Sequence, residues 1–590
     1  MKRTKIVATI GPATDSPGLL AQMISQGLDV VRMNFSHGSY EDWDERIERV
    51  KGEIEASGKH VPLLLDTKGP EIRTSYVEGF DEDQGAKVVL ERDSIVTFVC
   101  REGSATREGP RSTQSEIYLS YGKLPELVTP GGLLLIDDGS IATRIIEASG
   151  ERIRAQVLNT GLLGSRKGLN APGVALEFPH LIDKDRDDIL YGVSKGIDFV
   201  AESFVRDAED VLAVRRLLNQ NDGRDVKIIA KIENAQGVEN INEILTIADG
   251  IMVARGDLGV EIPYDQVPTV QDELIEKAVG LGKIVITATH MLNSMIENPI
   301  PTRAEVSDVY NAVKSSSTCV MLSGETAFGR YPLESVQAMT KIIDSAEKNT
   351  TPNITVPLEG HVSPAVTSTG VQLARMTKST AIIVYTESGS TARYTSAFRP
   401  SVPIIAITKN ERVARQMNAL WGVIPVLDTK ERDFETMFTD GAELAHQALG
   451  LEEGDTVIAL AGTHVGISGS TNTIRILSIG EVIAHGQCMN PGVARGTVRI
   501  CETYQDAKEA IKKGDIAAVF NFTADYEDLC PLFAGLIIAG SNYDQRTLEH
   551  ARSCGIPIIV DVRGIEQKFT DGQQVVLNAD KGAVLVARNV

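Results

Sequence analysis

Short apolar runs rich in β-branched residues alternate with amphipathic segments through residues 1–350, and this alternation restricts the fold more than any other feature. Near-continuous apolar strands that alternate with helices predict a parallel sheet covered on both faces. Eight units favour a closed (β/α)8 barrel over an open doubly wound sheet, although the count alone leaves the open sheet as an alternative. The eight runs are Lys5–Ile10, Val30–Phe35, Pro62–Thr67, Asp198–Phe204, Lys227–Glu233, Gly250–Ala254, Ile284–Thr289 and Cys319–Ser323.

The alternation is interrupted once, after the third run. Residues 70–167 contain short strand-like segments and charged residues, with turn signals such as Asp138-Gly139 and Ser149-Gly150. We expect a small β-barrel domain inserted in a βα loop. Because such loops lie on the catalytic face of a barrel, the insert is expected to act as a lid.

Two further segments follow the predicted barrel. Residues 351–475 resume the α/β pattern and predict an open-sheet domain, and residues 476–590 predict a compact mixed domain. The expected domains are therefore 1–69 with 168–350 for the catalytic barrel, 70–167 for the lid, 351–475 for a third α/β domain and 476–590 for an extra C-terminal domain.

The composition excludes some classes of partner. The chain of 590 residues has 59 Lys and Arg against 80 Asp and Glu, a net charge of −21. This excess of negative charge disfavours nucleic acid and anionic membranes as partners. The six cysteines form no CxxC pair, the N-terminus resembles a strand rather than a signal peptide, and no apolar run is long enough to span a bilayer. We therefore expect a cytoplasmic protein.

Three charged residues fall at the ends of the fifth and sixth runs. Lys231 and Glu233 are two residues apart, so their side chains point to the same side of a strand, and Asp257 lies just past the sixth run. Two carboxylates and a lysine from neighbouring strands suit a Mg²⁺ ion completed by substrate oxygens. A salt bridge at the barrel rim is the less favoured alternative.

A second polar cluster follows the second and third runs. Arg32, Asn34 and Ser36 alternate along one strand, and Asp66 and Thr67 end the next. Their oxygens are hard ligands that suit a hard cation. A hydrogen-bond network that closes the barrel mouth explains the spacing equally well.

Hydroxyl groups end two further strands. Thr289 ends the seventh run, where it is suited to orienting a proton or to capping a helix; the neighbouring His290 is given no role. In the third domain, small hydroxyl residues surround Gly389 at a helix start, where they favour a phosphate-binding nest, with an ordinary capped helix as the alternative. These residues are Thr386, Ser388, Ser390 and Thr391.

Several of these segments together resemble the pyruvate kinase family. The resemblance covers about residues 1–475, and its barrel motifs are highly specific. The matching runs are Thr4–Ala13, Arg32–Gly38, Leu65–Arg73, Lys231–Asn234, Val253–Pro263, Pro301–Asp308, Met321–Ala327 and, in the third domain, Ala381–Thr408.

The resemblance implies a reaction that transfers the phosphoryl group of phosphoenolpyruvate to ADP, giving pyruvate and ATP. It makes Glu233 and Asp257 the ligands of Mg²⁺ or Mn²⁺. Lys231 and Arg32 are then expected to stabilise the phosphoryl group, and Lys231 to stabilise the enolate that follows. Thr289 belongs to the proton relay that forms pyruvate.

The remaining ligands follow from the same resemblance. K⁺ is expected at Asn34, Ser36, Asp66 and Thr67, and Glu71 is the residue type that accompanies K⁺ dependence in this family. The substrate carboxylate is expected at the backbone N–H groups of Gly256 and Asp257. The nucleotide is expected at Asn34, His37, Arg73 and Lys184.

The resemblance also concerns regulation and assembly. The nest in the third domain resembles the family's pocket for a phosphorylated allosteric effector, with the loop 466–471 as a further candidate, and a homotetramer is expected. The last segment resembles the phosphohistidine domain of enzymes that use phosphoenolpyruvate. Because Arg546 occupies the histidine position, phosphoryl carriage there is not expected, and a packing or regulatory role is left.

Some residues depart from the family pattern. A catalytically weak paralogue that senses phosphorylated metabolites is therefore an alternative, and a metal-dependent aldolase or lyase on the same barrel is a less favoured one. The departures lie near the fourth, seventh and eighth strands, at Glu202, His290, Asn293, Tyr310 and Ser315–Thr318.

Overall fold

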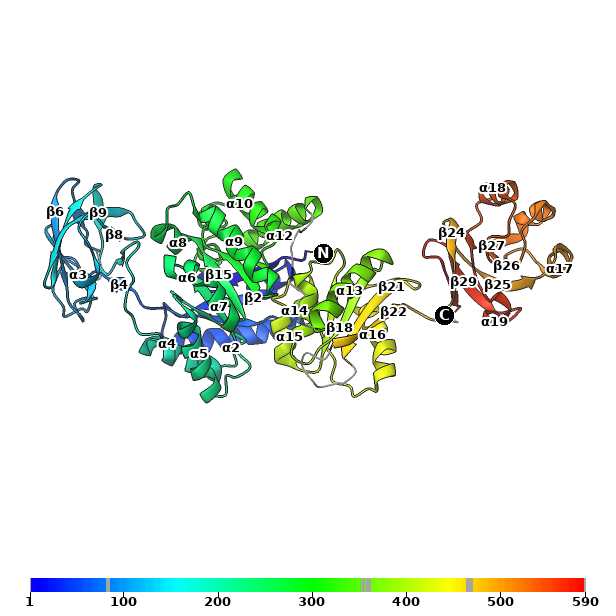
Figure 1. The fold of residues 1–590 in the computed structure, drawn as a ribbon, viewed down its shortest axis with the longest axis horizontal. Coiled ribbons are helices and arrows are strands. Elements are labelled where there is room, and N and C mark those ends of the chain that lie inside the picture. Colours follow the sequence, from blue (N-terminus) through cyan, green and yellow to red (C-terminus); the bar gives the residue numbers. More distant parts are fainter. Residues whose placement is uncertain are drawn as a thin grey trace. The chain divides into compact units, whose positions relative to one another are not determined.

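Eight parallel strands form a closed barrel in the first part of the chain (Figure 1), which confirms the barrel and excludes the open sheet. The structure is a computed structural model that describes residues 2–80, 85–350, 352, 356, 362–462 and 471–587. The strands are hydrogen-bonded in the order β1-β17-β16-β15-β14-β13-β3-β2. Their bounds are β1 (Lys5–Thr9), β2 (Val30–Asn34), β3 (Leu63–Asp66), β13 (Phe199–Glu202), β14 (Lys227–Ile232), β15 (Gly250–Ala254), β16 (Ile284–Ala288) and β17 (Cys319–Leu322).

Helices connect these strands, and side-chain caps fix where several of them begin. Ser39 accepts the N–H of Asp42 at the start of α2, Asp207 caps α5, and Thr302 forms a capping box at the start of α10. The helices are α1 (Leu19–Ser25), α2 (Tyr40–Ser57), α4 (Asp183–Ser194), α5 (Ala208–Gln220), α6 (Ala235–Glu239), α7 (Ile241–Ile247), α8 (Arg255–Glu261), α9 (Val267–Gly280), α10 (Arg303–Lys314), α11 (Gly324–Ala327) and α12 (Pro332–Asn349).

The alternation of side chains along each strand decides which residues enter the barrel. In β14, Ile228, Ala230 and Ile232 belong to the apolar core that includes the surrounding helices. Lys231 therefore faces the barrel interior, because successive side chains point to opposite faces of a sheet. In β3 the same alternation turns Asp66 inward. The interior at the carboxyl ends of these strands is thus polar.

The insert after β3 has its own sheet and its own apolar core. Seven strands follow the order β4-β12-β8-β9-β10-β6-β7. A bridge between Thr74 and Leu119, and a 3.0 Å bond from the Ser120 N–H to the Arg73 carbonyl, join the two edges of this sheet. The strands are β4 (Ile72–Arg73), β5 (Val88–Leu90), β6 (Ile95–Cys100), β7 (Glu116–Leu119), β8 (Leu133–Ile136), β9 (Ile141–Ser149), β10 (Arg152–Val157), β11 (Gly161–Leu163) and β12 (Gly168–Asn170), with one short helix, α3 (Leu124–Leu127).

Two more sheets follow the barrel in sequence. A five-stranded sheet has the order β20-β19-β18-β21-β22, and an eight-stranded sheet has the order β23-β30-β29-β25-β26-β27-β28-β24. The first contains β18 (Ala381–Tyr385), β19 (Ile404–Thr408), β20 (Val423–Leu427), β21 (Thr456–Gly462) and β22 (Thr471–Ser478), with helices α13 (Val362–Met376), α14 (Ser390–Ala397), α15 (Glu411–Met417) and α16 (Phe434–Leu449).

The eight-stranded sheet mixes parallel and antiparallel pairs, as β25 pairs parallel with β26 and antiparallel with β29. Arg546 is exposed in the first turn of its helix α18 (Gln545–Ser553). The other elements are β23 (Val482–His485), β24 (Gln487–Asn490), β25 (Val493–Cys501), α17 (Tyr504–Ala510), β26 (Asp515–Val519), β27 (Phe533–Ile538), β28 (Ile558–Val560), α19 (Ile565–Lys568), β29 (Gln574–Asn578) and β30 (Ala583–Val586).

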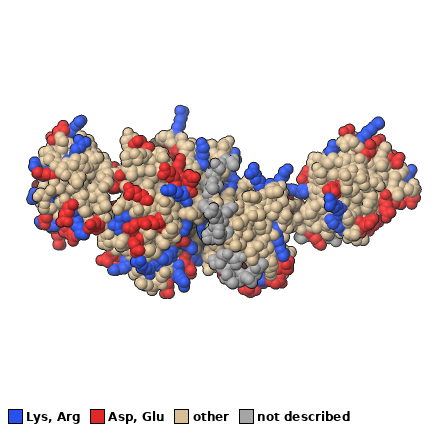
Figure 2. Space-filling model, in the orientation of Figure 1, with Lys and Arg blue, Asp and Glu red and all other residues tan. Residues whose placement is uncertain are grey.

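The surface carries both signs of charge. Figure 2 shows basic side chains interspersed with the more numerous acidic ones on the face in view, so the net charge of −21 is not confined to one patch there. Among the described helices, none combines the length and hydrophobicity needed to cross a bilayer.

By its contacts, the chain divides into two units, and residues 392–399 and 410–425 group with the barrel. In the barrel unit, Arg399 is a buried cation that lies beside the unusual segment Ser315–Thr318. Its guanidinium donates to the Ser316 carbonyl at 2.9 Å and to the Thr318 hydroxyl at 3.2 Å. Within the described chain it forms no ion pair, and its Nε has no partner. Ser316 also has a φ of +74°, a conformation that favours glycine. This departure therefore leaves a buried guanidinium with no carboxylate bonded to it among the described residues.

We predict that Thr318→Asp stabilises the barrel unit, because it places a carboxylate where Arg399 now bonds a neutral hydroxyl. The expected gain is about 1 to 2 kcal/mol in the free energy of unfolding. Urea unfolding followed by tryptophan fluorescence measures it, since both tryptophans, Trp43 and Trp421, lie in this unit. Thr318→Asn, similar in size but uncharged, is the control, and equal midpoints for the two variants would contradict the explanation.

Candidate active site at the barrel mouth

Four charged side chains of alternating sign, from three barrel strands, are bonded in a row that we call the charged chain. Arg32 of β2 donates through Nε to Asp66 Oδ2 at 2.6 Å. Lys231 Nζ of β14 lies 3.1 Å from Asp66 Oδ1 and 3.0 Å from Glu233 Oε1. All four are buried, and Asp66 is fully so. The structure thus brings the two polar clusters of the sequence into one connected site.

Ser203 belongs to this site, although we did not select it from the sequence. Lys231 Nζ donates to Ser203 Oγ at 2.7 Å, and that hydroxyl donates to the Thr67 carbonyl at 2.7 Å. The Ser203 N–H also donates to Thr67 Oγ1 at 3.1 Å. Its only signal was its place at the end of the fourth strand. Ser203 therefore fixes the position of the lysine ammonium between strands.

Burial and neighbouring charges shift the titration of these groups. Burial alone lowers the pKa of Lys231, but the Asp66 and Glu233 carboxylates outweigh it and raise that pKa above its ordinary value. Burial, together with the Asp257 charge, raises the pKa of Glu233 to about 7 against the opposing effect of Lys231. Burial also raises the pKa of Asp257. Glu233 and Asp257 therefore disfavour each other's charge when no cation lies between them.

Thr289 and Gly256 meet at the ends of β16 and β15. The Gly256 N–H donates to Thr289 Oγ1 at 2.7 Å, and this hydroxyl donates to the Ala288 carbonyl at 2.7 Å. Thr289 has a φ of +65° and His290 one of +54°, so two successive residues adopt the left-handed region. A Cβ on Gly256 would lie 3.4 Å from the His290 ring. His290 is therefore at the mouth, beside the backbone N–H expected to bind a carboxylate.

A cavity opens beside this cluster. It is lined by Asp257 and Phe204 from the loops of the barrel and by Glu71, Asp138 and Asn170 from the insert and its connection to the barrel. The Phe204 N–H donates to Glu233 Oε2 at 2.7 Å, so the cavity wall is bonded to the charged chain. A ligand in this cavity would contact both the barrel and the insert.

The oxygen ligands expected for a monovalent cation are neighbours. Asn34 of β2 lies opposite Asp66 of β3 in the parallel ladder. Asn34 Oδ1 accepts the Ser36 N–H at 3.2 Å, and Thr67 follows Asp66 directly. Carbonyl, hydroxyl and carboxylate oxygens at one strand edge fit a hard cation.

The side chains expected to contact a nucleotide do not join the charged chain. Lys184 of α4 donates to both oxygens of Asp188, at 2.7 and 2.8 Å, and Arg73 pairs with Glu71. His37 is exposed. Lys184 and Asp188 are one helical turn apart, a spacing that could have indicated the pair in the sequence. Lys184 lies apart from Lys231 because it is on α4, and Arg73 because it is on strand β4 of the insert.

The nest of the third domain is partly occupied by its own hydroxyl groups. Ser388 Oγ and Ser390 Oγ lie 3.3 Å apart, and the buried Thr391 bonds Thr471 at 2.7 Å. Thr386 ends the same loop on its strand side. Residues 466–470 of the second candidate loop lie outside the described residues. The hydroxyl cluster remains a predicted phosphate site.

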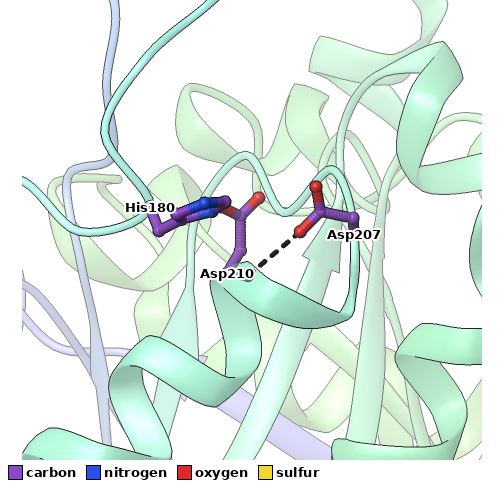
Figure 3. Close-up of side chains that lie close together, drawn as sticks. All are labelled: His180, Asp207 and Asp210. Carbon is purple, nitrogen blue, oxygen red and sulfur yellow. Dashed lines mark hydrogen bonds and ion pairs between the residues drawn. The ribbon is translucent and has the colours of Figure 1, made fainter.

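A separate group of ligand-type side chains, His180, Asp207 and Asp210, lies near the start of α5 (Figure 3), and the sequence did not predict it. Its candidate ligand atoms lie within 4.8 Å of one another. Arg206 Nη2 already lies 2.7 Å from Asp210 Oδ1, and Asp207 accepts backbone N–H groups as the cap of α5. Because the guanidinium supplies the positive charge, we interpret this group as structural.

Comparison with known proteins identifies the same two regions. Residues 1–336 match the family model described as the barrel domain of pyruvate kinase. Residues 364–477 match the model described as the alpha/beta domain of pyruvate kinase. The first match alone covers more than half of the chain.

Whole-chain relatives agree. A pyruvate kinase of Sporosarcina psychrophila is 40% identical over 598 aligned positions, covering 99% of both chains. One from Geobacillus stearothermophilus is 38% identical, covering 99% of this chain and 98% of its own. A crystal structure of a pyruvate kinase from Cryptosporidium parvum matches with a TM-score of 0.74 and 36% identity, covering 81% of this chain and 96% of its own. The two bacterial relatives thus extend over the eight-stranded C-terminal sheet.

We predict that Asp66→Asn destabilises the barrel, because it removes the carboxylate that Arg32 and Lys231 share and leaves two buried cations close together. The expected loss is about 3 to 5 kcal/mol in the free energy of unfolding. Urea unfolding followed by tryptophan fluorescence measures it.

Ser36→Ala is the control for this measurement, since it alters the same mouth without changing a charge. It should change the unfolding free energy by less than about 0.5 kcal/mol. If Asp66→Asn were as stable as Ser36→Ala, the shared carboxylate would not hold the mouth together.

Proposed function

The chain belongs to the pyruvate kinase family, and from this premise we propose how its side chains perform the family's reaction. The protein transfers the phosphoryl group of phosphoenolpyruvate to ADP in glycolysis, giving pyruvate and ATP. The observation that supports the residue roles is the chain of Arg32, Asp66, Lys231 and Glu233 at the barrel mouth.

Lys231 and Arg32 hold the transferring phosphoryl group. Both cations face the barrel mouth and are fixed by the Asp66 carboxylate, so they need no rearrangement as negative charge develops. The raised pKa of Lys231 keeps its ammonium charged throughout the physiological pH range. When the phosphoryl group leaves, the same ammonium stabilises the enolate of pyruvate.

The family uses Mg²⁺ and K⁺. Glu233 and Asp257 fit the divalent ion, because burial raises the pKa of both and the Asp257 charge adds to the rise at Glu233, a conflict that a cation would relieve. When bound, Mg²⁺ neutralises phosphoryl and carboxylate oxygens of the substrate. Mn²⁺ would serve equally. Asn34, Ser36, Asp66 and Thr67 offer the oxygens suited to K⁺.

Thr289 and the first turn of α8 complete the substrate site. The Gly256 and Asp257 N–H groups are placed to donate to the substrate carboxylate once Gly256 releases the Thr289 hydroxyl. That hydroxyl then passes a proton toward the enolate carbon. The nucleotide contacts Asn34, His37, Arg73 and Lys184, and the last two must first leave their carboxylate partners.

Regulation, assembly and location complete the proposal. Thr386, Ser388, Ser390 and Thr391 bind the phosphate of an allosteric effector; failure of every sugar phosphate and nucleoside monophosphate tested to raise the melting temperature would reject this role. The chain forms a homotetramer, which light scattering tests. The cytoplasm is the proposed location, because the substrates are glycolytic and all six cysteines are free thiols.

We predict that Lys231→Met strongly slows phosphoryl transfer while the fold persists. The rate should fall by about 10²- to 10³-fold or more, because a preorganised charge at the reacting group is lost. Pyruvate formation, coupled to lactate dehydrogenase, measures it, and circular dichroism checks the fold.

Lys227→Met is the matched control. Lys227 lies at the other end of β14 and pairs with Asp249, away from the mouth. It should keep its turnover. Equal activity of the two variants would remove Lys231 from the reaction.

The K⁺ assignment gives a separate prediction. Turnover should fall when Na⁺ replaces K⁺, and Glu71→Lys should restore part of the lost rate by supplying a fixed charge. The same coupled assay measures both. Undiminished turnover in Na⁺ would contradict the assignment.

A further inference from the structure

Two segments connect the barrel to the insert, and both are bonded to one region of the barrel. The first connector, residues 67–71, leaves the barrel after β3, and the second connector, residues 171–182, returns before α4. The region that holds them consists of the end of β13, the turn into α5 and the first turn of α4. Any movement of the insert relative to the barrel must therefore change the contacts of these two connectors.

Asp185 of α4 holds the first connector. Its buried carboxylate accepts the N–H of Lys68 at 3.1 Å and the N–H of Gly69 at 3.1 Å. Gly69 has a φ of +75°, and a Cβ on it would lie 2.7 Å from Ser203 Cβ and Phe204 Cδ2. The connector backbone therefore packs directly against the end of β13.

Arg206 holds the second connector. Its Nη1 donates to the carbonyls of Leu176 at 3.2 Å and Phe178 at 3.0 Å, and its Nη2 donates to that of Pro179 at 3.4 Å. Asp210 fixes the guanidinium through Nη2 at 2.7 Å and Nε at 3.1 Å. A planar guanidinium with several donors suits this task, and a lysine could not span the same carbonyls.

The ring of His180 strengthens this arrangement, because its Nδ1 lies 2.7 Å from Asp210 Oδ1 (Figure 3). Asp207 is the N-cap residue of α5. The carboxylate of Asp210 is therefore the common anchor of the second connector, as Asp185 is of the first.

Glu202 lies at the end of β13, where the charges of both anchors, Asp185 and Asp210, act on it. It shares the outward face of β13 with Val200, a member of the core that the strands form with the helices. Its side chain is only 4% exposed, and its Oε2 has no hydrogen-bond partner among the described residues. The charges that act on it come from Asp185 on α4, Arg206 and Asp207 in the turn, and Asp210 on α5.

This environment disfavours a charge on Glu202. Burial, followed by the nearby carboxylates of Asp210 and Asp185, raises the pKa of Glu202 well above its ordinary value. The buried carboxyl, unpartnered at Oε2 among the described residues, therefore favours its neutral form more than an ordinary glutamate does. It loses its proton only when the pH rises through the raised pKa.

We propose that Glu202 is a positioning residue for the lid, whose neutral carboxyl allows Asp185 and Asp210 to hold both connectors at once. An ionised Glu202 would repel Asp185 and Asp210. It would also offer Arg206 a second carboxylate, in competition with the connector carbonyls. Loss of the proton therefore loosens the lid from the barrel.

The kinetic consequence rests on the proposed function, since Arg73, the proposed nucleotide contact, belongs to the lid strand β4. A looser lid should weaken ADP binding and leave the affinity for phosphoenolpyruvate, bound on the barrel, unchanged. At about pH 9 the KM for ADP of the unmodified protein should exceed that of Glu202→Gln by about fivefold, because more of Glu202 is then ionised and repels Asp185 and Asp210. At about pH 6.5 the difference should be smaller, because a larger share of Glu202 is then protonated.

Hydrogen–deuterium exchange tests the same proposal without substrates. At about pH 9, the amides of Lys68 and Gly69 should exchange faster in the unmodified chain than in Glu202→Gln measured under the same conditions. Arg206→Lys should loosen the lid at every pH and raise the KM for ADP by about tenfold, because several charge-assisted hydrogen bonds are lost. This exchange result stands even if the proposed catalytic roles fail.

Asp198→Asn is the matched control, since Asp198 is a buried carboxyl just before the other end of β13 and pairs with Arg415. It should lower stability without changing the exchange of Lys68 and Gly69 or the KM for ADP. The proposal is overturned if Glu202→Gln follows the unmodified protein at both pH values in exchange and in KM. It is also overturned if Asp198→Asn reproduces the effects of Arg206→Lys.

Discussion

The Asp66 carboxylate lies between Arg32 and Lys231, and the barrel mouth depends on this shared anion. Two cations that must both face a phosphoryl group repel each other, and burial removes the water that would screen them. One carboxylate bonded to both offsets that repulsion and fixes their spacing. The parallel ladder supplies the geometry, because β2, β3 and β14 present these residues at the same barrel edge.

The charged mouth and the lid connectors are parts of one bonded region. Glu233 accepts the N–H of Phe204, and Phe204 and Ser203 pack against Gly69 of the first connector. Ser203 in turn bonds Lys231. A displacement of the first connector therefore reaches Lys231 through Ser203, which contacts both. This continuity gives the insert a direct route to the reacting groups.

Much of this architecture could be predicted from the sequence. Apolar runs of strand length fixed the eight barrel strands to within one or two residues, and the spacing of Lys231 and Glu233 placed both on one side of a strand. The missed residues have a common reason. Ser203 and Asp185 act through partners distant in the chain, such as Lys231 and the Lys68 backbone, and no local pattern records such a contact. Glu202 was noticed only as a departure, since its meaning depends on the helices packed over it.

The backbone at Thr289 has a consequence for engineering and for evolution. A β-branched residue in the left-handed region costs on the order of 1 to 3 kcal/mol, and here His290 repeats the conformation. Glycine would relax this turn, so a screen that selects only for heat resistance would favour it. Such a screen would discard the hydroxyl that the turn presents. At residue 289, selection for stability thus favours glycine, whereas selection for turnover favours threonine.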